Sequence, residues 1–183
     1  MKSEIPENSG SSKMQLFRFR EGVSFQAEAA AKPMEKEDIE VKAGLSLLLK
    51  SGFLDGISST ILFDAAGFSL ARLQIKQGFR LPLHVHNVDC LYCIIGGSLR
   101  VGNEDLGVGD GFFVPAGVPY AITAQELGAE ILEFRHSPVY DVTTRFLAKN
   151  SRYWENIARS ILENRDKWSL DTAPAASASC VAD

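Results

Sequence analysis

Two of the three histidines in this chain lie two residues apart, as His84 and His86. On a β-strand, residues i and i+2 point to the same face and lie about 6–7 Å apart. Two imidazoles placed in this way can share one metal ion, because histidine nitrogen is a common ligand of divalent transition metals. The pattern also fits two surface histidines on an exposed strand, since His-x-His is short and occurs by chance.

The residues around the pair form a longer pattern. From Gly78 to Gly97 the spacing is G-x5-H-x-H-x3-C-x6-G, and from Gly109 to Ala124 it is G-x5-P-x-G-x2-Y-x3-A. These stretches resemble the two motifs of the cupin superfamily, G-x5-H-x-H-x3-E-x6-G and G-x5-P-x-G-x2-H-x3-N. Cys90 stands at the glutamate position and Tyr120 at the second-motif histidine position. The resemblance covers roughly residues 40–138 and implies a jelly-roll β-barrel.

The resemblance also implies a metal inside the barrel. In cupins the two histidines and the glutamate of the first motif, with the histidine of the second, bind a divalent metal. His84 and His86 match, so a divalent transition metal (Fe, Zn, Mn or Ni) is expected and no organic cofactor. Cys90 as thiolate, with Tyr120 as phenolate, can complete the ligand set. Otherwise a third ligand comes from elsewhere in the chain, or the metal is lost and the histidines hydrogen-bond a ligand or buried water.

His136 is the third histidine and the candidate for such a recruited ligand. In residues 130–136, Glu133 and Arg135 have one strand parity, whereas Leu132, Phe134 and His136 have the other. If the charged face meets solvent, His136 points into the barrel.

Tyr120 and the pair Cys90 and Cys93 each allow a second interpretation. Tyr120 is predicted to act as an acid or as a hydrogen-bond donor to substrate, or else to fill the barrel as an aromatic side chain. Cys90-x-x-Cys93 has the spacing of a redox dithiol, but the segment has strand character, so the two thiols should lie on opposite faces. Cys93 is therefore expected to be a small buried hydrophobic residue.

Composition restricts the class of protein. The chain has 183 residues, 45% hydrophobic and 23% charged, which is typical of one globular domain. A net charge of −4 gives no electrostatic reason to expect nucleic acid. No segment resembles a membrane span or a secretory leader, and three cysteines make no disulfide framework, so a cytoplasmic protein is expected.

Between its ends the chain has the pattern of a β protein. Short apolar runs, among them 45–50, 59–63, 69–76 and 129–134, are separated by Gly, Pro, Asn and Asp. In 71–76, apolar and polar residues alternate, which predicts a strand with one buried face. The fold class predicted is all-β, a jelly-roll barrel with an N-terminal arm and a C-terminal helix.

The ends of the chain differ from this pattern. We expect residues 1–13 and 171–183 to be disordered tails, 14–140 to form the barrel with its arm, and 141–170 to be helical. Apolar residues at helical spacing between Asn150 and Trp168 predict an amphipathic helix, packed on the barrel or at a dimer contact.

The function predicted is that of a small-molecule cupin, a metal-dependent enzyme of dioxygenase, lyase or isomerase class that holds its metal through His84 and His86. The alternative is a non-catalytic ligand-binding or sensor barrel, and a third is a metal-free isomerase that uses Tyr120 and a histidine. The expected partners are a small-molecule substrate and a second copy of the chain, because sheet edges and a Phe-rich strand favour a homodimer.

Overall fold

The structure is a computed structural model that describes residues 14–24, 38–148 and 150–168. Both expected tails, 1–13 and 171–183, lie outside the described residues. In chain order the elements are η1 (Phe19–Glu21), β1 (Val23–Ser24), α2 (Ile39–Lys50), η2 (Phe53–Asp55), β2 (Ile57–Ala65), β3 (Phe68–Ile75), β4 (Arg80–His86), β5 (Cys90–Val101), β6 (Glu104–Leu106), β7 (Gly111–Val114), β8 (Tyr120–Arg135), η3 (Val139–Asp141), β9 (Thr144–Phe146) and α3 (Ser151–Arg165). No helix in this described part is long and apolar enough to cross a membrane.

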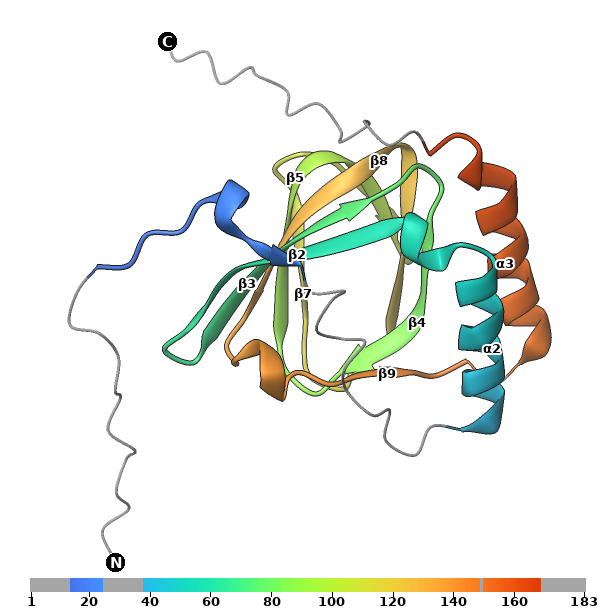
Figure 1. The fold of residues 1–183 in the computed structure, drawn as a ribbon, viewed down its shortest axis with the longest axis horizontal. Coiled ribbons are helices and arrows are strands. Elements are labelled where there is room, and N and C mark those ends of the chain that lie inside the picture. Colours follow the sequence, from blue (N-terminus) through green and yellow to red (C-terminus); the bar gives the residue numbers. More distant parts are fainter. Residues whose placement is uncertain (1–13, 25–37, 149, 169–183) are drawn as a thin grey trace, which may run out of the picture.

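The strands form one curled antiparallel sheet (Figure 1). Its order is β1-β2-β3-β8-β4-β9, and β5 pairs with β8 along most of its length and also with β6 and β7. Strand β8 is central because its first part pairs with β4 and its second part with β3. The curled sheet and the C-terminal helix confirm the predicted all-β jelly-roll class.

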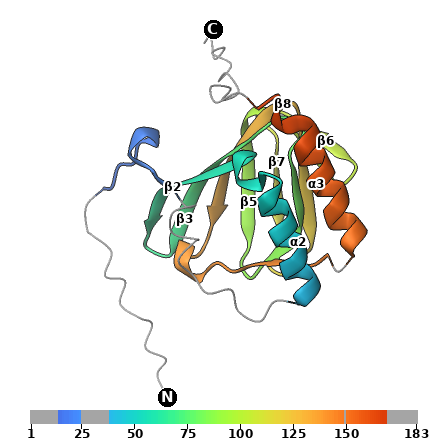
Figure 2. The ribbon, with the colours of Figure 1, turned by 45° about the vertical axis from the view of Figure 1, so that its right-hand side comes forward.

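Helices α2 and α3 pack side by side against one side of the barrel (Figure 2). Asn150 caps the first turn of α3 by accepting the N–H of Arg152. Trp154 is buried against α2, where a Cβ on Gly44 would lie 2.2 Å from the indole ring, so only glycine permits this close helix packing. The amphipathic helix predicted between Asn150 and Trp168 is therefore confirmed, and it covers the barrel. The prediction that 141–170 is helical throughout is wrong, because Thr144–Phe146 pairs with β4 as strand β9.

The run 45–50 is helical, so the prediction of a strand there is wrong. It forms the second half of α2, where Leu45, Leu47 and Leu48 contact the core. A short apolar run has no period of its own, and here packing against α3 selects the helix.

Inside the barrel, β3, β8, β5 and β7 align their inward residues in rows. Each row takes one inward side chain from each paired strand: Ser69, Arg135, Cys90 and Val114 in the first, Ala71, Glu133, Tyr92 and Phe112 in the second, and Leu73, Ile131 and Ile94 in the third. The first two rows contain the polar side chains, and the third is apolar. The polar groups therefore lie at one level of the barrel, above an apolar core.

Candidate metal centre

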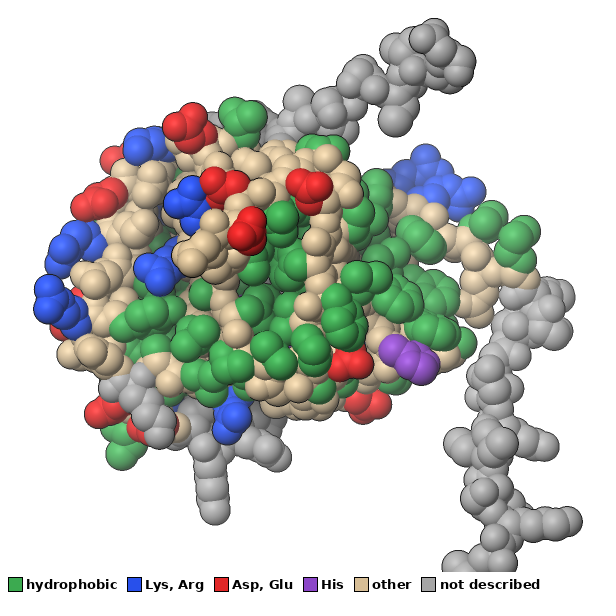
Figure 3. Space-filling model, turned by 180° about the vertical axis from the view of Figure 1, so that it is seen from behind, with side chains coloured by type: hydrophobic (Ala, Val, Ile, Leu, Met, Phe, Trp, Pro, Cys, Tyr) green, Lys and Arg blue, Asp and Glu red, His purple; other side chains and the backbone are tan. Residues whose placement is uncertain are grey.

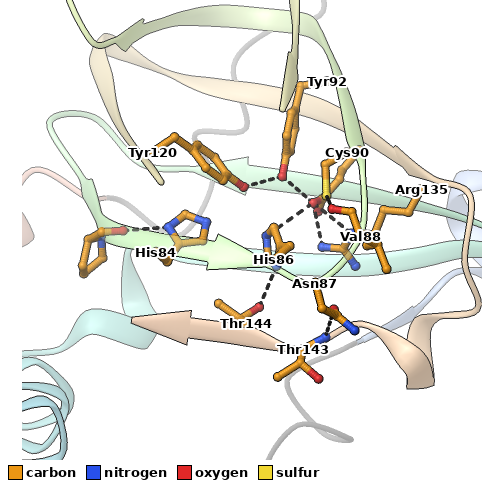
Figure 4. Close-up of polar contacts among 12 residues, drawn as sticks. His84, His86, Asn87, Val88, Cys90, Tyr92, Tyr120, Arg135, Thr143 and Thr144 are labelled. Carbon is orange, nitrogen blue, oxygen red and sulfur yellow. Dashed lines mark hydrogen bonds and ion pairs between the residues drawn. The ribbon is translucent and has the colours of Figure 1, made fainter. Parts of the chain in front are cut away.

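His84 and His86 both point into the barrel, as their strand spacing predicts (Figure 4). They lie at the end of β4, are 1% and 8% exposed, and have ring centroids 5.1 Å apart. Strand β9 holds this end of β4, with His84 opposite Phe146 and His86 opposite Thr144. The expectation that both imidazoles face the interior is confirmed.

Hydrogen bonds orient both imidazole rings. His84 Nδ1 lies 2.7 Å from the carbonyl oxygen of Pro82, which can only accept, so Nδ1 carries the proton and Nε2 has the lone pair. His86 Nδ1 lies 3.0 Å from the Thr144 hydroxyl, and its Nε2 lies 3.9 Å from Glu133 Oε1. A ring fixed through one nitrogen, with the other directed inward, is the usual arrangement of metal-binding histidine.

Burial keeps both rings neutral. It lowers the pKa of His84 below its ordinary value and that of His86 to about 4. Neutral imidazole is the form that binds a metal.

Glu133 joins the site from β8, although the sequence analysis placed it at the surface. Its side chain is 3% exposed. Oε1 accepts hydrogen bonds from the Tyr92 hydroxyl at 2.6 Å and from Arg135 Nε at 3.0 Å, and Arg135 Nη2 lies 2.6 Å from the same oxygen as part of the ion pair. Burial by itself would raise the pKa of Glu133, but the Arg135 guanidinium holds it below its ordinary value. Glu133 is therefore a buried carboxylate with a cationic partner.

Cys90 lies at the start of β5, beside Arg135 in the register of the sheet. Its Sγ donates to the Val88 carbonyl at 3.6 Å, and burial raises the pKa of the thiol to about 11. Cys93 is exposed on the other face of the same strand. The opposite-face prediction for the two thiols is thus confirmed, and the prediction that Cys93 is buried is wrong.

Three of these side chains form a candidate metal triad. Ligand atoms of His86, Cys90 and Glu133 all lie within 4.8 Å of one another, and all three residues are buried. A nitrogen, a sulfur and a carboxylate oxygen from three different strands fit zinc or iron. His84 is adjacent to the triad but is not a member of it.

Tyr120 and Tyr92 continue the site on its other side. Their hydroxyl oxygens lie 2.5 Å apart, and the Tyr92 proton goes to Glu133, so Tyr120 donates to Tyr92. Burial raises the pKa of both hydroxyls, which therefore stay protonated. Tyr120 also packs against His84, with ring centroids 4.3 Å apart.

His136 does not reach the site, so the expectation that it points inward is wrong. It is exposed and stacks on Phe68, with ring centroids 4.7 Å apart. The alternation in 130–136 separates the two faces correctly, but the charged face is the inner one: Glu133 and Arg135 face the interior. The two opposite charges pair with each other, which lowers the cost of burying them. The general rule that charged residues lie at the surface does not include such pairs.

Among curated proteins, none matches the chain. Solved structures that match include a deletion mutant of Bacillus subtilis oxalate decarboxylase, with 25% identity over 50% of this chain and 28% of that one, at a TM-score of 0.45. A second structure of that enzyme, from work on its Mn(II) centres, matches at 26% identity over 46% of this chain, with a TM-score of 0.42. The chain spans only 26% of that structure's length.

An RmlC-like cupin from Shewanella frigidimarina matches at 20% identity, over 46% of this chain and 78% of that one, with a TM-score of 0.43. A family model, described as "Domain of unknown function (DUF4437)", matches residues 57–152, from the start of β2 into the first turn of α3. This match spans just over half of the chain and contains every residue of the metal triad, so the chain belongs to the DUF4437 family.

Proposed function

We propose that the barrel interior binds one divalent transition-metal ion through His86, Cys90 and Glu133, and that the protein is a small-molecule metalloenzyme. The observation that supports this most strongly is the convergence of three different donor atoms within 4.8 Å in a buried site. Glu133 takes the place of the acidic ligand that the first motif lacks at Cys90. His84, with an Nε2 lone pair and its ring 5.1 Å from that of His86, is the side chain best placed to complete the coordination.

The charges around the triad are balanced before an ion binds. Glu133 and Arg135 neutralise each other, and both histidines and the Cys90 thiol are uncharged at neutral pH. A divalent ion replaces the thiol proton, because a bound metal stabilises the thiolate. The sulfur ligand favours zinc or iron over manganese, which prefers oxygen ligands.

A bound ion would supply Lewis-acid chemistry at this position. The chain's own residues would orient the ligands and control protons. Tyr120 and Tyr92 form a hydrogen-bonded line that ends on Glu133, so a proton arriving at Tyr120 can be relayed to the carboxylate. His84 packs beside this line, with its ring centroid 4.3 Å from that of Tyr120, and its Nε2 lone pair stays available to the ion.

The buried ion pair favours a second candidate, a ligand-binding barrel without metal. Arg135 already satisfies Glu133 through Nε and Nη2, so the carboxylate is stable without an ion. In that case the histidines would bind a ligand by hydrogen bonds alone.

Metal content tests the proposal. We expect the purified chain to take up about one equivalent of zinc or iron, measured by elemental analysis after dialysis. His86→Ala, Cys90→Ser and Glu133→Gln should each bind at least tenfold less, since each loses one of three ligands. Two matched controls are His136→Ala and Cys93→Ser, which remove the same side chains from the outer surface and should leave uptake unchanged. Equal metal in all five variants, or none in the wild type after reconstitution, would exclude the metal centre and leave the ligand-binding barrel.

A further inference from the structure

The hydroxyl of Ser69 is buried on the inner face of β3 without a hydrogen-bond partner. Ser69 is 2% exposed, and its Oγ is the one buried side-chain nitrogen or oxygen in the described ranges that lacks a partner. Buried polar atoms in native proteins almost always have partners, and an exception calls for an explanation. A bound ligand atom would provide one.

The register of the sheet places Ser69 next to the metal triad. Ser69 is directly opposite Arg135, which is itself opposite Cys90 on its other side. Directly opposite residues in antiparallel strands have Cβ atoms about 4.5–5.5 Å apart. Ser69, Arg135 and Cys90 thus form one level of the interior, beside the proposed ion.

Arg135 has donors to spare. It uses Nε and Nη2 for Glu133 Oε1, so the N–H groups of Nη1 take no part in that ion pair. A guanidinium carries five N–H donors and no acceptor. The unpartnered Ser69 O–H and a guanidinium with more donors than its pair with Glu133 uses lie at one level of the sheet, which suits the two oxygens of a carboxylate.

The charge of the site sets the charge of the ligand. Glu133 and Arg135 cancel, so a divalent ion leaves the interior positive whether Cys90 binds as thiol or thiolate. Asp64 lies opposite Ser69 on β2, where its Oδ1 accepts the N–H of Val139 at 3.1 Å. This nearby carboxylate opposes a second negative charge on the ligand.

We propose that Ser69 and Arg135 form a subsite for the carboxylate of a small monocarboxylic acid, adjacent to the metal triad. The inference names the substrate class of the proposed metalloenzyme and rests on that function. It also explains the unpartnered hydroxyl, which is satisfied only when the ligand is bound.

The test is a calorimetric titration of propionate into zinc-loaded protein, with neutral propionamide as the matched control probe. Wild type should bind propionate and not propionamide. Ser69→Ala should bind propionate about tenfold more weakly, because a hydrogen bond to a charged group is lost. Ser58→Ala removes an exposed hydroxyl from the neighbouring strand β2 and should bind like wild type. Without propionate, Ser69→Ala should melt at a higher temperature than wild type, because an unpaired buried hydroxyl is removed.

The outcomes separate the two proposals. Full zinc content with no propionate binding, or with equal affinity in Ser69→Ala, overturns the subsite and leaves the metal centre intact. If the wild type takes up no zinc, the metal proposal fails. If the metal-free chain then binds propionate and Ser69→Ala weakens this binding, the subsite is supported. If the metal-free chain does not bind propionate, the subsite is overturned.

Discussion

Where the start of β5 pairs with the end of β8, polar side chains lie on the inner face and large apolar side chains on the outer face. Tyr92 and Glu133 are paired on the inner face, whereas the adjacent outward pair is Leu91 and Phe134. A sheet that packs one face on a core normally has the reverse arrangement. Polar groups are costly to bury, so their presence inside indicates a site, and exposed aromatic residues indicate a surface that has a partner.

The outer apolar face consists of Phe68, Leu91, Phe113 and Phe134, which are 38–58% exposed on four neighbouring strands. Figure 3 shows this side of the molecule, where hydrophobic side chains form a broad continuous area. The arm, residues 14–24, adjoins it: the Arg72 guanidinium on β3 lies 5.2 Å from the centre of the Phe19 ring.

We propose that a second copy of the chain covers the outer apolar face. Together with the arm's exposed residues Met14, Leu16, Phe17 and Phe19, the face exposes roughly 800 Å² of apolar side chain per copy, taking about 200 Å² for each large side chain. This is the area that each partner buries in a stable interface of standard size.

The largest expected effect concerns the inner face. Arg135→Met should lower the free energy of unfolding by about 3–5 kcal/mol, because it leaves the Glu133 carboxylate buried and unpaired. Urea denaturation at pH 7 measures this loss. The double variant Glu133→Gln with Arg135→Met should recover much of it, since no charge is left unpaired. Arg100→Met breaks the exposed pair with Asp105 and should change stability little; a loss as large as that of Arg135→Met would remove the contrast between inner and outer charges.

A second effect comes from the pH dependence of the inner face. His86 has a folded-state pKa of about 4, below its ordinary value of 6.5, so the unfolded chain takes up a proton between these pH values while the folded chain does not. The free energy of unfolding should therefore fall as pH drops from 6.5 to 4, by about 3 kcal/mol for this side chain, at about 1.4 kcal/mol per tenfold difference in proton affinity. Burial of neutral His84 adds to the loss, and Glu133, whose pKa is also lowered, extends it below pH 4.5.

Urea denaturation across pH 4–8 with a chelator present measures this dependence. His86→Gln should flatten the curve, and His136→Gln, on the exposed side, should leave it as steep as in wild type. An unchanged curve in His86→Gln would mean that His86 has the same pKa in the folded and unfolded chain, so that its burial does not lower that pKa.

The third effect concerns the outer face. Wild type should run as a dimer of the 20.0 kDa chain in light scattering at micromolar concentration, and Phe134→Glu should weaken the dimer at least tenfold, because it places a charge in the centre of the apolar area. The monomeric variant should remain folded, since the position is partly exposed. Leu162→Glu changes an exposed apolar residue on α3, outside the outer apolar face, and should stay dimeric. If the wild type is a monomer at micromolar concentration, the proposal that a second copy covers the outer apolar face is wrong.

The contrast between inner and outer faces also explains which parts of the site the sequence predicts. The spacing of His84 and His86 predicts one face, and the alternation in 71–76 identifies buried Ala71, Leu73 and Ile75 correctly. Alternation in 130–136 gives two faces but not which one is inside. That choice depends on Arg135 and Tyr92 satisfying Glu133, and Tyr92 lies about forty residues away in the chain, so no local pattern contains it.

One signal for the inner position of Glu133 was present in the sequence. Ile131 shares its parity and Gly128 precedes the run, and in the structure Gly128 has a φ of 72° and lies against Gly97, where the register of β5 and β8 shifts. Two glycines at these positions permit a kink that reverses which parity faces inward, since Tyr120, Ile122 and Ala124 are buried before it. The sequence shows the two glycines, but the change of inward parity between them follows only from the pairing of β5 with β8.

The smallest effect distinguishes the two tyrosines at the inner site. Tyr120→Phe removes a donor to the Tyr92 oxygen and should cost about 1 kcal/mol, whereas Tyr92→Phe deprives both the Tyr120 hydroxyl and Glu133 of a partner and should cost more. Thermal unfolding with and without zinc measures both. Because the Tyr120 proton goes to Tyr92, Tyr120→Phe should keep its metal and its zinc-induced rise in melting temperature. Loss of the metal in Tyr120→Phe would instead make the phenolate a ligand, as the second cupin motif allows, and would move the ion from Glu133 towards β4 and the start of β8.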